Sequence, residues 1–140
     1  MESPLITVIT VSYNAASSIE QTIISVINQT YPHIEYIIID GGSKDNTIDI
    51  VREYEAQYKG RLRWIGEYDR GIYDAMNKGL KMASGDYVCF LNAGDKLPDI
   101  YTIETIVKNT ELEALQDSNL PLPAVLFGNT DIIDDEGNFL

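Results

Sequence analysis

Four short apolar runs, rich in β-branched residues, alternate along the chain with longer stretches of helical periodicity. Runs of this length and composition predict β-strands. Because they are almost continuously hydrophobic, we expect strands buried on both faces, as in a parallel sheet covered by helices. The predicted strands are residues 5–12, 35–39, 62–65 and 87–91.

Apolar residues recur at helical spacing between the predicted strands, and the first helix is expected to begin at a capping box formed by Ser17 and Glu20. The repetition of strand and helix implies right-handed crossovers and an α/β, Rossmann-like doubly wound sheet with helices on both faces. The apolar stripes are Ile19, Ile23, Val26 and Ile27; Ile48, Val51, Tyr54 and Tyr58; and Ile72, Ala75, Met76, Gly79, Leu80 and Ala83.

The last third of the chain predicts less regular structure. Because the chain stops on the apolar pair Phe139 and Leu140, we expect a sheet truncated at its C-terminus. Its apolar edge would be covered by a longer chain, by strand exchange or in a homodimer. The expected elements are a helix through Ile100, Ile103 and Val107, a polar loop over 109–123, a strand over 124–127 and a hairpin over 131–140 that turns at 134–137.

Composition limits the classes of partner. The 140 residues, 44% of them hydrophobic, fit one domain, and 22 acidic against 10 basic residues give a formal net charge of −12. This charge repels nucleic acid and anionic lipid, so nucleic acid is excluded as an expected partner. The lone Cys89 lies in an apolar run and predicts a buried core position. No apolar run approaches the roughly 20 residues of a membrane span, so we expect a soluble, cytoplasmic protein, which meets the inner face of the cell membrane only through a substrate, a partner or a parent protein.

Polar residues follow each of the four predicted strands. The carboxyl ends of parallel strands meet at the crevice where strand order reverses, so these loops are expected to form one ligand site. Asp40 ends its strand, and its carboxylate is expected to point into the crevice and accept hydrogen bonds from a base or ribose. The glycine spacing after it matches neither a Walker loop nor a dinucleotide-binding loop. The loops are residues 13–14, 40–46, 67–71 and 92–95.

The loop after the fourth strand is a candidate metal site. A diphosphate bound in so acidic a crevice needs a cation, and a divalent metal held by hard oxygen ligands would supply one. Asp95 and the amide oxygen of Asn92 are the candidate ligands. The same residues are also typical of a tight turn after a buried strand, and this structural alternative stays open.

Three segments resemble successive signatures of family 2 glycosyltransferases: residues 6–14 (ITVITVSYN), 37–47 (IIIDGGSKDNT) and 85–95 (GDYVCFLNAGD). The intervening segment 69–79 (DRGIYDAMNKG) resembles the bacterial branch that builds O-antigen and other surface polysaccharides. The resemblance covers essentially the whole chain. It implies that residues 1–140 are the nucleotide-sugar-binding part of a GT-A domain.

The resemblance also implies site roles. Val11 and Tyr13 would line the nucleoside pocket, Asp40 would bind the base, usually uracil, and Asp69 would close the other side of the pocket. The family's aspartate-x-aspartate element, which holds the donor diphosphate and a divalent metal (Mn or Mg), falls on residues 92–94. Both aspartates of that element are absent here, so Asp95 becomes the best expected metal ligand and Asn92 a neutral one. The family's catalytic base lies further downstream, so we expect it beyond Leu140.

The implied activity is transfer of a sugar from a nucleotide-diphosphate donor, with UDP as the expected nucleotide, to a glycan or lipid-linked acceptor in polysaccharide biosynthesis. The family resemblance implies inversion at the anomeric centre. One alternative is a non-catalytic nucleotide-sugar-binding module, which the altered metal element favours. Another is a receiver-like interaction domain that uses Asp40 as a phosphoacceptor, although Tyr13 and Asn14 stand where such a domain has paired acids.

Overall fold

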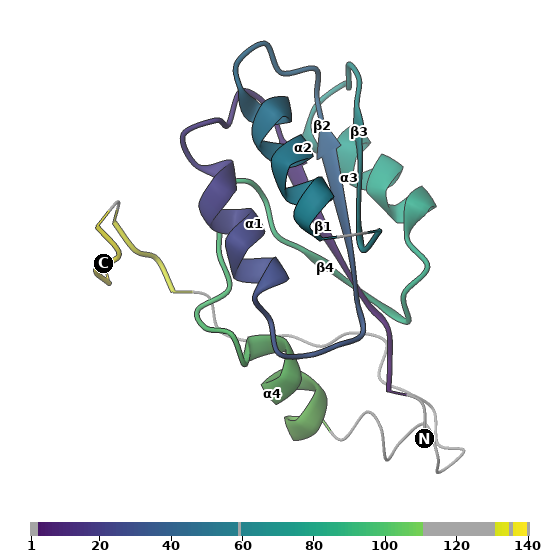
Figure 1. Ribbon diagram of the computed structural model, residues 1–140, viewed down its shortest axis with the longest axis vertical. Helices are drawn as coiled ribbons and strands as arrows, with labels where there is room; N and C mark the ends of the chain where they lie inside the picture. Colours follow the sequence, from purple (N-terminus) through teal and green to yellow (C-terminus); the bar gives the residue numbers. More distant parts are fainter. Residues whose placement is uncertain (1–2, 59, 111–130, 135, 140) are drawn as a thin grey trace.

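The computed structural model describes residues 3–58, 60–110, 131–134 and 136–139 (Figure 1). Its centre is a four-stranded parallel sheet in the order β3-β2-β1-β4. β2 lies beside β1, β3 lies beside β2, and β4 pairs with the other side of β1. The strand order therefore reverses between β1 and β4, and the predicted α/β fold is confirmed. The strands are β1 (Ile6–Ser12), β2 (Ile34–Asp40), β3 (Leu62–Gly66) and β4 (Tyr87–Phe90).

Helices pack on both faces of the sheet. α1 (Ile19–Ile27), α2 (Thr47–Gln57) and α4 (Thr102–Asn109) share one apolar core with one set of alternating strand residues. α3 (Ile72–Met82) contacts the opposite set through Ala75. In Figure 1, α1 and α2 lie in front of the sheet and α3 lies behind it. The two connections that run from β1 to β3 thus use one face, and the connection into β4 uses the other.

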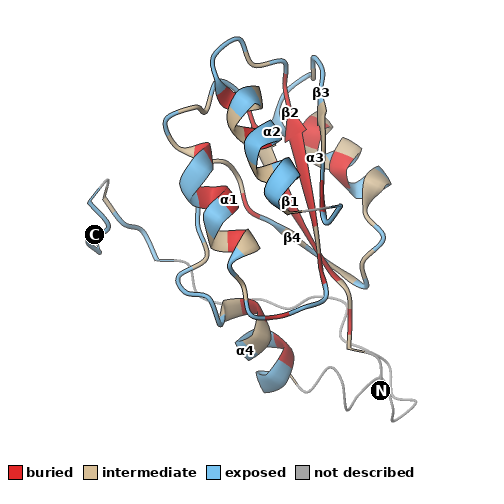
Figure 2. Ribbon diagram, in the orientation of Figure 1, coloured by how far each residue is buried: buried red, intermediate tan, exposed pale blue. Residues whose placement is uncertain are grey.

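Burial on both faces holds for the two central strands and fails at the edge. β1 and β2 are buried along almost their whole length (Figure 2). In β4, by contrast, Val88 and Phe90 are 36% and 37% exposed, because the described residues place no helix over that part of the face. Cys89 packs toward the covered face, where burial raises the pKa of its thiol. The expectation of a doubly covered fourth strand is therefore wrong.

The predicted capping box at the start of α1 is not formed. The N-cap residue is Ser18 rather than Ser17, and it makes no side-chain capping hydrogen bond. The carboxylate of Glu20 instead accepts a hydrogen bond from the hydroxyl of Tyr54 on α2, with an O···O distance of 2.8 Å. This hydrogen bond, with partial burial, raises the pKa of Tyr54 to about 12. A tertiary contact between two helices has replaced the local cap.

Beyond β4, the fourth helix and the terminal hairpin are confirmed. α4 buries Ile103 and Val107 as predicted. In the hairpin, Ile133 and Phe139 form an antiparallel bridge, and the N–H of Gly137 donates to the carbonyl of Asp134. The loop expected over 109–123, apart from its first two residues, and the strand expected over 124–127 lie outside the described residues. No helix in the described part of the chain is long and apolar enough to cross a membrane.

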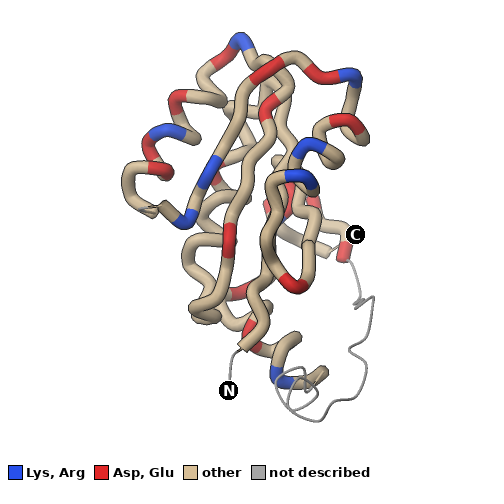
Figure 3. Tube along the Cα trace, turned by 90° about the vertical axis from the view of Figure 1, so that its right-hand side faces the viewer, with Lys and Arg blue, Asp and Glu red and all other residues tan. Residues whose placement is uncertain are grey.

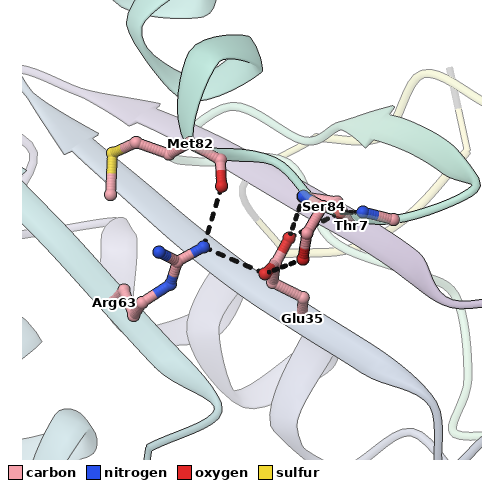
Figure 4. Close-up of polar contacts among 6 residues, drawn as sticks. Thr7, Glu35, Arg63, Met82 and Ser84 are labelled. Carbon is pink, nitrogen blue, oxygen red and sulfur yellow. Dashed lines mark hydrogen bonds and ion pairs between the residues drawn. The ribbon is translucent and has the colours of Figure 1, made fainter.

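A polar cluster ties three strands together at the amino-terminal edge of the sheet. Figure 4 shows the carboxylate of Glu35 accepting hydrogen bonds from the Thr7 hydroxyl (2.8 Å), the Ser84 N–H (2.8 Å) and hydroxyl (2.7 Å), and Arg63 (2.9 Å). Arg63 also donates to the carbonyl of Met82 at the end of α3. Desolvation would raise the pKa of Glu35, but the hydrogen bonds from Ser84 and Thr7 and the charge of Arg63 outweigh it and hold this pKa below its usual value.

Candidate functional site

The loops after β1 and β2 are clasped to each other by reciprocal hydrogen bonds. The N–H of Asn14 donates to the hydroxyl of Ser43 (2.7 Å), and the N–H of Lys44 donates to the side-chain oxygen of Asn14 (2.9 Å). Asn14 adopts a positive φ of 46°, a conformation that asparagine tolerates better than most residues. The clasp fixes the two loops as one unit at the carboxyl-terminal edge of the sheet.

Asp45 closes the same clasp at the start of α2. Its carboxylate accepts hydrogen bonds from the hydroxyl and N–H of Thr47 and from the N–H of Ala16 (3.1 Å). The hydrogen bond from the Thr47 hydroxyl, together with those from the backbone, holds the pKa of Asp45 below its usual value against a smaller opposing effect of desolvation. The sequence signal for this role is an aspartate placed just before a helix, where its side chain meets free N–H groups.

Asp40 is not oriented toward a free crevice. It is 0% exposed, and its carboxylate already accepts hydrogen bonds from the Ser12 hydroxyl (2.9 Å), the Gly42 N–H (3.0 Å), and the N–H (2.7 Å) and hydroxyl (2.6 Å) of Ser43. These donors fold the loop back over the end of β2. In this structure the chain's own donors occupy the carboxylate, and the expected contact of Asp40 with a nucleoside base stays a prediction.

Asp69, in the loop after β3, lies across the start of the loop after β2. A Cβ atom at Gly41 would stand 2.6 Å from the Asp69 Oδ2 atom, so the absence of a side chain at position 41 leaves room for this carboxylate. The other oxygen, Oδ1, accepts a hydrogen bond from the N–H of Gly71 (2.9 Å). The structure thereby joins the third loop to the first two.

Asn92 and Asp95 form a tight turn directly after β4. The N–H of Asp95 donates to the carbonyl of Asn92 (2.9 Å), and the N–H of Gly94 donates to the Thr22 hydroxyl of α1 (2.9 Å). The carboxylate of Asp95 belongs to an exposed residue. The side-chain Oδ1 of Asn92 is buried and has no hydrogen-bond partner among the described residues. A buried polar atom without a partner is uncommon in folded proteins and marks a place where a ligand can bind.

The two remaining predicted residues flank the point where strand order reverses. Val11 is half-buried near the end of β1, and its carbonyl accepts a hydrogen bond from the N–H of Ala93 (3.0 Å), which places the turn after β4 beside β1. Tyr13 follows β1 and is 61% exposed. All six predicted residues thus lie at or just beyond the carboxyl ends of strands, at the same edge of the sheet. The loops after β1, β2 and β3 contact one another, and the turn after β4 contacts β1.

The donor set at the turn after β4 fits part of a divalent metal site. No three His, Cys, Asp or Glu side chains among the described residues are grouped so that they could bind a metal by themselves. Asn92 Oδ1 and the carboxylate of Asp95 are, however, oxygen ligands of the kind that Mg and Mn prefer. Magnesium commonly takes one or two protein carboxylates and completes its shell with water and substrate phosphates. The residues therefore fit a cation that a bound diphosphate helps to hold.

A cavity of about 500 Å³ lies next to this turn, and one of the residues that line it is a lysine that the sequence analysis did not single out. Lys96 lines it together with the start of α1, while Asp134 and Glu136 contribute acidic groups from the terminal hairpin. The sequence signal for Lys96 is its position directly after Asp95. In Figure 3, basic residues are interspersed with acidic ones along the trace, in keeping with the net acidic composition.

A parallel sheet with helices on both faces and polar loops at its strand-order reversal is a doubly wound α/β domain, and its match to solved glycosyltransferases places it in the GT-A class. The profile of Glycosyl transferase family 2 matches residues 7–114, and the chain belongs to this family. Membership sets aside the receiver-like alternative.

Relatives and solved structures agree with this assignment. The chain is 46% identical over 94 residues to the "Putative teichuronic acid biosynthesis glycosyltransferase TuaG" of Bacillus subtilis (strain 168), covering 66% of this chain and 37% of the relative. It is 33% identical over 106 residues to a PGL/p-HBAD biosynthesis glycosyltransferase of Mycobacterium tuberculosis (strain ATCC 25177 / H37Ra), covering 76% of this chain and 41% of the relative. The chain thus spans well under half the length of these relatives.

Among solved structures, the mannosyltransferase PcManGT from Pyrobaculum calidifontis, in complex with GDP-Man and Mn2+, matches with a TM-score of 0.69 and 31% identity over 76% of this chain and 32% of that one. TarS 1-349 from S. aureus, in complex with UDP-GlcNAc, matches with a TM-score of 0.64 and 22% identity over 76% of this chain and 32% of that one. The second match supports the fold alone.

Proposed function

We propose that this chain is the nucleotide-sugar-binding part of a cytoplasmic glycosyltransferase of polysaccharide biosynthesis, acting on a glycan or lipid-linked acceptor at the inner face of the cell membrane. Family membership and the names of the relatives support the class of reaction. The observation that carries the proposal is the Oδ1 atom of Asn92, which is buried without a partner beside the strand-order reversal. A bound cation would coordinate that oxygen, or a hydroxyl of the donor would donate a hydrogen bond to it, and either would satisfy it.

In this proposal the nucleoside lies over the loops after β1, β2 and β3. The exposed ring of Tyr13 offers a flat surface on which a base can stack, and Val11 would line the same pocket. UDP is the proposed nucleotide on the family resemblance. GDP is the competing candidate, because the solved mannosyltransferase with 31% identity was bound to GDP-Man. The donor's diphosphate would extend toward the turn after β4.

A divalent cation, Mn or Mg, would be held by Asp95 and Asn92 together with the donor's diphosphate, and it would stabilise negative charge on the departing nucleotide. The chain's own residues bind and orient the donor. Inversion of the anomeric centre also requires a base that deprotonates the acceptor hydroxyl, and none of the six site residues is assigned to that role.

A non-catalytic nucleotide-sugar-binding module is the second candidate. The observation that favours it is the single carboxylate at the turn after β4, where the family's element would supply two. The two candidates predict the same donor binding and differ in transfer, which a measurement of nucleoside diphosphate release with and without acceptor distinguishes.

Isothermal titration calorimetry of the 140-residue chain tests donor binding. We expect saturable one-to-one binding of UDP or GDP in the presence of Mn2+, and binding at least about tenfold weaker in Asp95→Asn or when the cation is chelated. Asp49→Asn, which removes an exposed carboxylate from α2, is the matched control and should bind as the wild type does. Absence of binding to every nucleoside diphosphate, with the chain folded by circular dichroism, would contradict the proposal.

A further inference from the structure

The connection from β4 to α4 runs along α1 and is held there by side chains of the helix (Figure 1). Polar residues at helical spacing on α1, and one residue just beyond its end, form hydrogen bonds with backbone groups of this connection. The helix therefore fixes the path of a segment that lies between two regular elements. The pairs are the Gly94 N–H with the Thr22 hydroxyl (2.9 Å), the Leu97 N–H with the Ser25 hydroxyl (3.1 Å), and the Asp99 carbonyl (2.6 Å) and Ile103 N–H (3.0 Å) with the side-chain amide of Gln29.

The first of these hydrogen bonds holds the turn directly after β4, residues 92–95. Each N–H from residue 93 to residue 95 donates to a different part of the molecule: to the Val11 carbonyl of β1, to the Thr22 hydroxyl of α1, and to the carbonyl that begins the turn. Gln21, beside Thr22, donates to the carbonyl of Gly94 (3.3 Å). The turn is thus fixed between β1 and α1, and adjacent residues of α1 hold both the N–H and the carbonyl of Gly94.

Thr22 occupies a position where packing alone would accept an apolar side chain. It is 0% exposed and stands next to the buried Ile23 in α1. Its hydroxyl is a buried polar group, and the hydrogen bond from Gly94 satisfies it there. A valine has nearly the same shape but offers no acceptor to the Gly94 N–H. The oxygen at position 22 is therefore explained by the turn that it holds and not by the packing of the helix.

We propose that Thr22, assisted by Gln21, is the positioning residue of the turn that the proposed function assigns to a cation. The inference rests on the proposed function and deepens it. The two candidate ligands, Asn92 and Asp95, lie on either side of Gly94, so holding Gly94 sets their separation. This separation matters because Mg takes oxygen ligands only within a narrow range, about 2.0–2.1 Å. Residues that hold metal ligands in place typically contribute about 10–100-fold to metal affinity without touching the metal.

The variant Thr22→Val tests this role. Calorimetric titrations with UDP and with GDP, each in the presence of Mn2+ and again with the cation chelated, give a ratio of affinities that measures what the cation contributes. We expect this ratio to fall about tenfold in Thr22→Val, while the affinity without cation stays that of the wild type. Thr22→Ser keeps the oxygen that accepts from Gly94 and should keep the wild-type ratio.

Ser25→Ala is the matched control. It removes another hydroxyl of α1 that accepts a backbone N–H, but the donor is Leu97, which lies beyond the turn. Both variants should lower the melting temperature, and only Thr22→Val should lower the ratio. Gln21→Met is a milder second variant. Because Gln21 is exposed and its hydrogen bond to Gly94 is longer, the chain should keep its melting temperature and the ratio should fall about threefold.

The outcomes separate this inference from the proposed function. If the wild type binds neither UDP nor GDP, both fail. If the wild type binds nucleotide and Mn2+ adds nothing, nucleotide binding stands, and the cation site fails together with the role of Thr22. If Mn2+ strengthens binding equally in the wild type, Thr22→Val and Gln21→Met, the proposed function stands and the role of Thr22 is refuted.

Two further results would also refute the role of Thr22. One is a ratio that falls as far in Ser25→Ala as in Thr22→Val. The other is an affinity that falls equally with and without the cation in Thr22→Val. Either result is what a general loosening of the connection after β4 would produce, without any specific effect on the cation ligands.

Discussion

The two edges of the sheet both hold polar groups among buried strands, yet they treat them differently. At the amino-terminal edge, the carboxylate of Glu35 accepts hydrogen bonds from Thr7, Ser84 and Arg63 (Figure 4). At the carboxyl-terminal edge, the Oδ1 atom of Asn92 is buried without a hydrogen-bond partner among the described residues, and none of these residues donates to the Oδ2 atom of Asp69. The first edge is complete within the chain, whereas the second is incomplete.

Whether the polar groups of an edge are paired within the chain indicates whether that edge supports the fold or binds a ligand. A satisfied cluster stabilises the fold, because every buried donor and acceptor it contains is paired. A cluster with unpaired polar groups lowers the stability of the fold, and such groups persist mainly where a bound ligand supplies the missing interaction. The two edges do not differ in whether they carry carboxylates, since carboxylates occur at both. They differ in whether the polar groups have hydrogen-bond partners within the chain.

The same substitution at the two edges should have unequal effects. Gly85→Ala would place a Cβ against the Thr7 hydroxyl and 2.8 Å from the carbonyl oxygen of Leu5, and backbone atoms cannot move aside as the end of a side chain can. We expect a loss of about 3 kcal/mol or more in the free energy of unfolding, measured with urea. Gly41→Ala, for which the three nearest atoms all belong to the Asp69 carboxyl group, is the matched control and should cost far less. Equal losses would remove the contrast between a rigid and an adaptable edge.

Acid should weaken the amino-terminal edge through Glu35. Its pKa is lower in the folded chain than the usual value of 4.5, so the native state binds this proton less tightly than the unfolded state does. The stabilisation is complete above the unfolded value and is lost as the pH falls through the folded one. Glu35→Gln removes it, and we expect a loss of about 2 kcal/mol at neutral pH that shrinks below the usual glutamate value.

Urea unfolding at a series of pH values measures this effect. Glu53→Gln, on the exposed side of α2, removes the same charge without breaking a buried contact and is the matched control. A Glu35→Gln deficit that is as large at pH 3 as at pH 7 would contradict the linkage. Unchanged nucleotide affinity in this variant is expected, because the cluster lies at the edge away from the proposed donor.

The sequence predicted most of the fold because periodicity reports which face of an element is buried. The strand β2 and the helix α1 lie where their apolar spacing placed them. Periodicity does not report what lies opposite a strand, and for that reason the exposure of Val88 and Phe90 was missed. The capping box was also wrongly predicted, because the carboxylate of Glu20 accepts a hydrogen bond from Tyr54 on the neighbouring helix instead.

For the candidate site, the sequence predicted at which edge of the sheet the polar residues lie. It did not predict which hydrogen bonds their side chains form. Position identified Asp40 and Asp69 equally, because Asp40 ends one strand and Asp69 closely follows another. Only the three-dimensional arrangement shows that one carboxylate is fully occupied and the other half free. The hydrogen bond from Lys78 to the carbonyl of Tyr68 and the ion pair of Lys78 with Glu67 could not be predicted either. Both partners lie in a loop whose path depends on the packing of α3.

The smallest expected effect has an unusual sign and bears most directly on the incomplete edge. Replacing Asn92 with leucine removes a buried oxygen that has no partner, so we expect Asn92→Leu to stabilise the chain by about 1 kcal/mol in urea unfolding. The same change should weaken Mn2+-dependent nucleotide binding, because one oxygen ligand is gone. Asn92→Asp is the informative counterpart: it adds a charge that should strengthen cation binding while lowering stability. If leucine destabilised the chain, Asn92 would be supporting the fold, and the contrast between the two edges would not hold.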